Sequence, residues 1–321
     1  MGVNLPGVGW HRSENTVRLK RPMHRRDALK AALLAAAAPA ACIRQPAPQP
    51  KREPTMTTPS PEKTPSAAGR MPSIFLAHGS PMLLTDRGWM QELNAWAAAL
   101  PKPKSVLMLS AHWLDRPATI GATTRVPLVY DFYGFPDQFY TVQYPSPGAP
   151  ELAARVRQLL GPGNTTDDAK RGLDHGAYIP LVAMYPEAEV PVLQVSLPTL
   201  DPKELLAMGR ALAPLRDEGV LIVGSGFLTH NLRRMSFEPG APVPSWASDF
   251  DGWAGDVLAR KDVDALMDYR AKAPGVRESL PTHEHFVPVI TALGAGLDSA
   301  VTFPITGWTY GSGTKRSVQF G

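Results

Sequence analysis

Short, uninterrupted runs of apolar residues recur along the chain from residue 71 onward, and each ends in a polar or turn-forming segment. The clearest runs are Ser73–Ala77, Ser105–Ser110, Val190–Leu197 and Gly219–Gly226. A strand that is apolar at successive positions, rather than at alternate ones, is typically buried on both faces, as in a sheet covered by helices. The pattern therefore predicts four buried strands.

Segments with the apolar spacing of helices lie between and after these runs. Two of them begin with residues that suit an N-cap and a first turn, at Thr85-Asp86 and at Leu200-Asp201-Pro202. Strands that alternate with helices predict an α/β fold, here a single domain with a central, mostly parallel or mixed sheet flanked by helices. The expected helices are Asp86–Leu100, Pro150–Leu160, Pro202–Leu215, Trp246–Arg260, Asp262–Lys272 and Glu284–Ala295.

Composition narrows the class of protein. The 321 residues are 44% hydrophobic and 19% charged, which excludes a chain that is disordered throughout. A single cysteine excludes a disulfide framework and a cysteine-rich zinc module. The net charge of +4 combines +8 over residues 1–70 with −4 over residues 71–321. Because the basic residues belong to the N-terminal part, no nucleic-acid partner is expected for the rest.

An export signal is expected within residues 1–42. Arg25-Arg26 precedes an apolar stretch, Ala28–Ala38, and small residues follow. This order of charged, apolar and small segments is typical of a secretory signal, and the stretch is shorter than the about 20 residues that span a bilayer. Met23 stands directly before the signal and is an alternative start of the protein.

The details of the signal predict a route and a location. The segment RRDALK resembles the twin-arginine export motif, and Pro39–Cys42 resembles a lipobox, whose cysteine is lipidated after cleavage. The alternative is ordinary cleavage near Ala41, with Cys42 unmodified. Residues 43–70 contain seven prolines, which predicts an extended, disordered tether. We expect a protein that is exported, either periplasmic or attached to a membrane only through this lipid anchor; a cytoplasmic location is the alternative.

Three histidines stand where apolar runs end. His78 follows the first run, His112 follows the second, and His230 follows the run Gly219–Gly226. Ligands of α/β sheets bind outside the carboxyl ends of the strands, so these rings are placed to converge there. Converging imidazoles form metal sites with open positions. The alternative is that each is an ordinary polar residue at the end of a strand.

Five motifs stand in order along residues 71–321, and together they are far more specific than any one alone. They resemble the class III extradiol ring-cleavage dioxygenases, in the branch similar to 4,5-DOPA extradiol dioxygenase, and the likeness includes the closing RSVQFG. The resemblance implies that residues 71–321 are a catalytic domain that opens the ring of a catechol with dioxygen. The motifs are HGSPM (His78–Met82), SAHW (Ser110–Trp113), YDFYGFP (Tyr130–Pro136), LDHG (Leu173–Gly176) and PTHEHFVP (Pro281–Pro288).

The resemblance also implies roles for individual histidines. His78, His112 and His285 match metal ligands of the family. His230 matches a histidine at the metal centre, either as a ligand or as the acid/base. His175 matches a histidine that touches the substrate, and a neutral imidazole with a pKa near 6.5 suits transfer of the phenolic proton. We therefore expect His175 and His230 to be catalytic.

Other residues near these motifs carry weaker expectations. Glu284 is an alternative metal ligand, and Leu280 stands where relatives often have a histidine. His283 fills a variable position and is expected at the rim or surface. Asp131 and Ser80 are expected to hydrogen-bond the outer ring nitrogens of the site histidines. Four aromatic residues are expected either to wall the catechol ring or to pack as a loop: Tyr130, Phe132, Tyr133 and Phe135.

The reaction implied by the resemblance sets the cofactor. Ring cleavage requires a redox-active metal with positions for two catechol oxygens and for dioxygen, so Fe(II) is the expected metal. Ligation by histidines alone also suits Zn(II). Two alternative functions therefore stay open: a zinc-dependent hydrolase, and a non-catalytic, tethered metal-binding lipoprotein. The expected partners are a substituted catechol and dioxygen, and the sequence leaves the natural catechol and the oligomeric state open.

Overall fold

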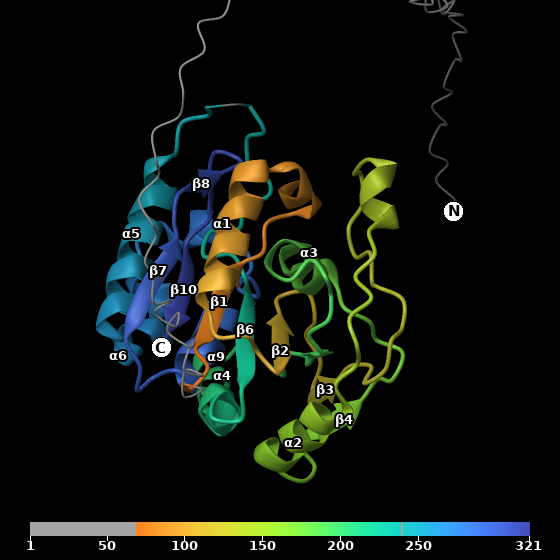
Figure 1. Cartoon of the computed structure of the whole chain (residues 1–321). Coiled ribbons are helices and arrows are strands. Elements are labelled where there is room, and N and C mark those ends of the chain that lie inside the picture. Colours follow the sequence, from red (N-terminus) through yellow and green to blue (C-terminus); the bar gives the residue numbers. More distant parts are fainter. Residues whose placement is uncertain (1–68, 239) are drawn as a thin grey trace, which may run out of the picture. The chain divides into compact units, whose positions relative to one another are not determined.

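A mixed sheet of six strands forms the centre of the part of the chain that the computed structural model describes, residues 69–238 and 240–321 (Figure 1). The strand order is β5-β2-β6-β1-β10-β7. The first four strands run parallel to one another, whereas β10 is antiparallel to β1 and β7 is antiparallel to β10. Their bounds are β1 Ser73–Ala77, β2 Ser105–Ser110, β5 Val192–Gln194, β6 Val220–Gly226, β7 Val301–Ile305 and β10 Ser317–Phe320.

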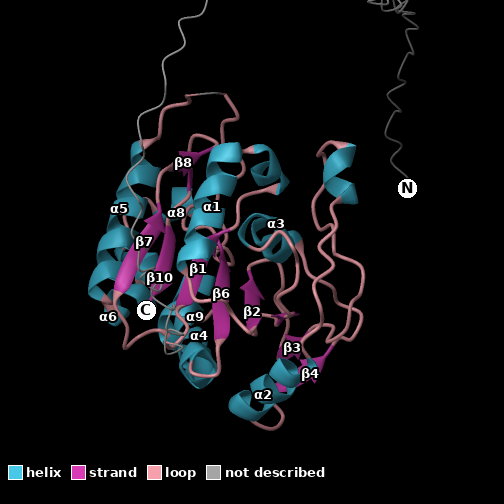
Figure 2. Cartoon of the chain, in the orientation of Figure 1, coloured by secondary structure: helices cyan, strands magenta, loops and turns pink. Residues whose placement is uncertain are grey.

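Helices cover both faces of the sheet, as Figure 2 shows. The helices α1 (Arg87–Ala99) and α3 (His175–Met184) pack on one face. On the other face lie α4 (Pro202–Leu212), α5 (Ser245–Arg260) and α9 (Pro288–Ala295). This layered arrangement encloses the central strands on both sides.

The side chains on the two faces of each central strand pack in two different hydrophobic cores. Phe75 of β1 and Leu107 of β2 pack with α4 and α9, whereas their neighbours Ile74 and Val106 pack with α1 and α3. All four side chains are fully buried. Alternate side chains of a strand point to opposite faces, so a strand between two helical layers must be apolar at successive positions. That requirement explains the uninterrupted apolar runs in the sequence.

The predicted fold class, a single α/β domain with a central mixed sheet, is confirmed. The helix expected at Pro150–Leu160 is α2, with those bounds. The run expected to continue to Leu197 forms a regular strand only over Val192–Gln194. The export signal and the proline-rich segment lie outside the described residues, and none of the helices that are described is long and apolar enough to span a membrane.

The strands β7 and β10 were not predicted, and three helical segments differ from the prediction. The helix expected over Asp262–Lys272 is two short helices that meet at Asp268, where φ −114° and ψ 26° depart from helical geometry. The helix expected from Glu284 begins only at Pro288, whose fixed φ suits the first helical turn. The helix α3 was not predicted, because nine of its ten residues are buried and it shows no polar face.

The remaining elements are short. Their four strands pair as two separate two-stranded sheets. Their bounds are η1 Pro81–Thr85, β3 Ala118–Ile120, η2 Asp137–Thr141, β4 Thr165–Asp167, η3 Ala213–Arg216, α6 Val263–Met267, α7 Tyr269–Lys272, α8 Val276–Ser279, β8 Trp308–Thr309 and β9 Gly313–Thr314.

Candidate metal centre

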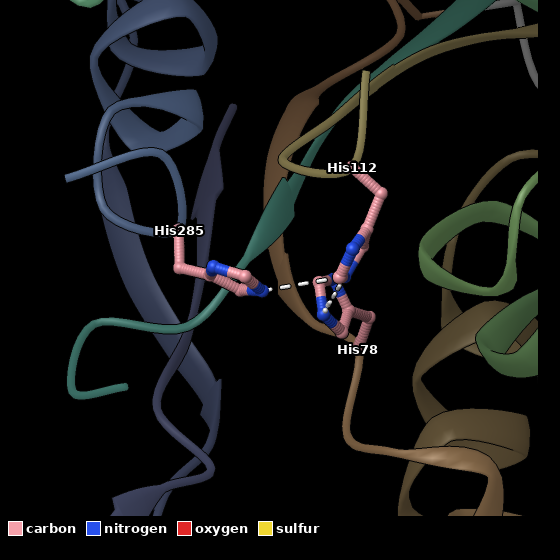
Figure 3. A group of neighbouring side chains, drawn as sticks. All are labelled: His78, His112 and His285. Atoms are coloured by element: carbon pink, nitrogen blue, oxygen red, sulfur yellow. Dashed lines mark hydrogen bonds between the residues drawn. The ribbon is translucent and has the colours of Figure 1, made fainter. Parts of the chain in front are cut away.

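Three histidines from distant parts of the chain meet at one edge of the sheet (Figure 3). His78 directly follows β1, and His112 lies two residues beyond the end of β2. Both strands are parallel to β6, which lies between them, so their carboxyl ends reach the same edge. His285 arrives from the segment that leads into α9. We call His78, His112 and His285 the three-histidine cluster.

The ring nitrogens of the three-histidine cluster face one another. The Nε2 atom of His112 lies 3.2 Å from Nε2 of His78 and 3.2 Å from Nε2 of His285. His78 is 1% exposed and His285 is 4% exposed, whereas the His112 side chain keeps 19% of its surface accessible. The cluster is therefore buried on two sides and reachable from the side of His112.

Hydrogen bonds fix the proton of two rings on the outer nitrogen. The Ser225 hydroxyl donates to the Gly176 carbonyl, so Nδ1 of His78, 2.9 Å from the same hydroxyl oxygen, must be the donor in their contact. Nδ1 of His285 donates to the Glu284 carboxylate at 3.0 Å. A neutral imidazole protonated at Nδ1 has its free lone pair on Nε2. The bare Nε2 atoms of His78 and His285 each lie 3.2 Å from Nε2 of His112, so the three rings present a donor set that fits a metal ion.

Burial keeps the three-histidine cluster neutral, and hydrogen bonds keep the Glu284 carboxylate charged. Burial, followed by repulsion from the neighbouring histidines, holds the pKa of His78 and that of His112 well below 6.5. Burial also lowers the pKa of His285. Burial acts to raise the pKa of Glu284, but hydrogen bonds led by that from His285 outweigh it and lower the pKa to about 2. Neutral rings backed by a carboxylate are the state that binds a metal.

His175 lies beside this cluster at the first position of α3. Its ring centroid is 4.0 Å from that of His112 and 5.7 Å from that of His78. Nδ1 of His175 lies 2.8 Å from the Asp131 carboxylate, as predicted for Asp131, and the other Asp131 oxygen is 3.6 Å from Nδ1 of His112. His175 therefore neighbours the cluster without belonging to it.

His230 stacks on the cluster from the other side. Its ring is 3.5 Å from that of His285, and the two planes differ by only 12°. Imidazole lone pairs lie in the ring plane, so the lone pairs of two stacked rings run side by side and do not point at one common centre. Burial, together with the neighbouring His285, lowers the pKa of His230 to about 3. Donor atoms of His230, Glu284 and His285 lie within 4.8 Å of one another, and so do those of His112, Asp131 and His175.

The predicted aromatic residues lie at different distances from the histidines. Phe132 packs edge-on against His175, with centroids 5.6 Å apart. The Tyr130 hydroxyl donates to the Val142 carbonyl at 2.7 Å, and Phe135 packs against Phe132. Tyr133 is 91% exposed. Of the four, Phe132 is the one in contact with a site histidine.

Comparison with known proteins shows which family the chain belongs to. The family described as the catalytic LigB subunit of aromatic ring-opening dioxygenase matches residues 72–321. The chain belongs to this family. It is an extradiol ring-opening dioxygenase of class III, as the five motifs predicted.

Individual relatives agree with the family. A 4,5-DOPA dioxygenase extradiol of Beta vulgaris is 38% identical over 262 residues, covering 77% of this chain and 96% of the relative. One of Escherichia coli is 37% identical over 263 residues, covering 78% of this chain and 95% of the relative. A crystal structure of an uncharacterized protein from Escherichia coli K12 is 35% identical, with a TM-score of 0.68, covering 78% of this chain and all of that one.

One sequence prediction around this dioxygenase site is wrong. Ser80 does not bond an imidazole; its hydroxyl pairs with the Tyr310 hydroxyl at 2.9 Å and caps η1 by accepting from the Met82 N–H. His283, expected at the rim or surface, is partly exposed. It is half-buried against the ring of Tyr269, with centroids 5.5 Å apart, and its Nδ1 is enclosed without a hydrogen-bond partner among the described residues.

The contacts of several neighbouring residues carried no signal in the sequence. Ser225 supports His78 from inside β6, where a small polar residue resembles any other strand position. Gly176 passes so close to His112 that an added Cβ atom would lie 2.9 Å from its ring. Leu280, at the position where relatives often have histidine, is 2% exposed and packs in the core. Only the folded chain shows these contacts.

Proposed function

We propose that this dioxygenase opens the ring of a substituted catechol at a metal held by His78, His112 and His285. The observation that carries the proposal is that Nε2 of His112 lies 3.2 Å from Nε2 of His78 and from Nε2 of His285, two rings whose protons are held on Nδ1. Fe(II) is the proposed metal. When bound there, it supplies open coordination positions and the redox chemistry that brings catechol and dioxygen to react.

The proposed proton acceptor is His175. Its Nδ1 is engaged by Asp131, so its Nε2 is free to take the phenolic proton of a catechol bound beside His112. The His175 side chain is 9% exposed, which limits access of bulk water to the transferred proton. Phe132 packs edge-on against this ring and is proposed to line the catechol pocket.

His230 is proposed to act beside the metal, not as a ligand to it. In its stacked position its lone pairs lie parallel to the plane of His285 and miss an ion bound by that ring. Its lowered pKa, about 3, means that the ring is neutral at physiological pH. A neutral ring accepts or donates one hydrogen bond at each nitrogen, which suits contact with the substrate.

A DOPA-like catechol is the proposed substrate class. The support is that relatives 37–38% identical to this chain carry the name 4,5-DOPA dioxygenase extradiol. Substrate preference is set by the residues around the metal rather than by the fold, so it requires its own test.

The test is oxygen uptake after anaerobic reconstitution with Fe(II), together with absorbance of the ring-opened product, on DOPA, caffeate and protocatechuate. Uptake is expected with at least one catechol, and His112→Ala should abolish it together with metal binding. His283→Gln is the matched control, since it changes a histidine of the same region that lies outside the cluster. Hydrolysis of esters or amides that depends on Zn(II), with no oxygen uptake on any catechol, would overturn the proposal.

We also propose that the protein is exported through the twin-arginine route, with Cys42 as a lipid anchor and residues 43–70 as a tether. The support is the sequence alone, in the order of Arg25-Arg26, the apolar stretch and PAAC. Replacing both arginines by lysine should leave the precursor in the cytoplasm, as cell fractionation would show. Export at the normal level in that variant would argue against this route.

A further inference from the structure

The carboxylate of Asp131 faces two histidines of the site, His175 and His112. Oδ1 of Asp131 accepts a hydrogen bond from the backbone N–H of His175 at 3.1 Å and lies 2.8 Å from Nδ1 of the same residue. Oδ2 of Asp131 lies 3.6 Å from Nδ1 of His112. The Asp131 side chain is 21% exposed, and the two imidazoles it faces are 9% and 19% exposed. Asp131 therefore stands where a ring of the metal cluster meets the proposed proton acceptor.

The backbone holds this carboxylate in place. Val129 pairs in parallel with Asp174, and its N–H donates to the Leu173 carbonyl at 2.9 Å. This pairing sets the segment of Asp131 alongside the first residue of α3. The Asp174 side chain caps the same helix by accepting from the Ala177 N–H. Hydrogen bonds near both residues therefore hold the contact between Asp131 and His175 in place.

The donor in this contact follows from charge. Oδ1 of Asp131 faces both the backbone N–H of His175, at 3.1 Å, and its Nδ1, at 2.8 Å, and two such hydrogen bonds favour the ionised carboxylate. An ionised carboxylate only accepts hydrogen bonds, so Nδ1 of His175 is the donor and its free lone pair is on Nε2. A negative charge 2.8 Å from the ring also stabilises the imidazolium that forms when Nε2 takes a proton.

We propose that Asp131 is a positioning residue that fixes His175 with a bare Nε2 beside the three-histidine cluster and stabilises His175 once it is protonated. This inference rests on the proposed function for the proton that His175 accepts. It goes beyond that function because it names Asp131 as the residue that orients the proton acceptor, His175. The same carboxylate faces His112, so it also aligns the acceptor with one ring of the metal cluster.

The first test reads the ring tautomer directly and needs no catalysis. Long-range ¹H–¹⁵N spectra of the full chain, labelled with ¹⁵N-histidine and loaded with Zn(II), should show His175 protonated at Nδ1, with the signal assigned from His175→Gln. In Asp131→Ala a substantial fraction of the molecules should carry the His175 proton on Nε2. In the control Asp137→Ala, which changes an exposed carboxylate of the same segment, the tautomer should be that of wild type. An unchanged His175 tautomer in Asp131→Ala overturns the proposal.

The second test separates the charge from the hydrogen bond. Asp131→Asn keeps an oxygen that accepts from His175 but removes the charge, and it serves if the alanine variant does not fold. With Fe(II) saturating, kcat on a cleaved catechol should fall by about 10²- to 10⁴-fold in Asp131→Asn, with a smaller change in KM. A kcat equal to that of Asp137→Ala overturns the proposal, and so does complete loss of metal binding, which would make Asp131 a ligand. If no catechol is cleaved by wild type, the proposed function fails, and the tautomer spectra still decide the role of Asp131.

Discussion

Gly176 gives the sharpest structural test of the metal centre, because its missing side chain leaves room for two of the cluster's rings. An added Cβ atom would lie 2.5 Å from Oγ of Ser110, 2.9 Å from Cδ2 of His112 and 3.2 Å from Nδ1 of His78. Carbon atoms in contact normally stand at about 3.5 Å or more, so the His112 ring must move by roughly half an ångström or more. Metal–nitrogen distances tolerate only about 0.2 Å, so Gly176→Ala should disturb the centre.

The expected effects of Gly176→Ala are a loss of stability of about 1–3 kcal/mol from overpacking and a loss of metal affinity of at least about tenfold. Urea unfolding and competition with a chromophoric chelator for Zn(II) measure the two effects. The matched control is Gly252→Ala in α5, where an added Cβ meets nothing within 4 Å. That change should be neutral or stabilising by up to about 1 kcal/mol, with metal affinity unchanged. If both variants behave alike, the rings do not have the close packing described here.

Two further predictions concern single contacts. Ser225→Ala removes the oxygen that accepts a hydrogen bond from Nδ1 of His78. The affinity for Zn(II) should therefore fall by about 10- to 100-fold while the fold is retained. An affinity equal to that of wild type would contradict the role given to this hydroxyl. Asp251→Ala leaves the guanidinium of Arg316 without its bidentate partner at a site that is 11–18% exposed, and should cost about 2–4 kcal/mol in urea unfolding. Asp256→Ala, at an exposed ion pair, should cost less than about 0.5 kcal/mol, and equal losses in the two variants would refute this difference.

The sequence predicted the parts of the site that depend on local pattern. His78 and His112 follow buried parallel strands, and the geometry of such strands brings them to one edge without further information. His285 is different. It precedes a helix that is apolar on all sides, and only the resemblance to known dioxygenases connected it with the other two histidines.

The parts that were not predicted depend on tertiary contacts. The helix α3 has no polar face, so its periodicity is hidden, although it brings His175 and Gly176 to the cluster. Ser225 and Gly176 are 49 residues apart and share a hydrogen bond that no local pattern encodes. His283 was expected at the rim or surface because its motif position is variable, and its packing against Tyr269, which encloses its Nδ1, is a contact that no local pattern encodes.

The claim on which the account depends is that three imidazoles hold one metal ion through Nε2. The most direct measurement is an anaerobic crystal structure of the Fe(II)-loaded protein, with the iron located by its anomalous signal. We predict one iron about 2.0–2.2 Å from Nε2 of His78, His112 and His285, with no bond to His230. Iron bound instead between Asp131 and His175, or between Glu284 and His230, would contradict it.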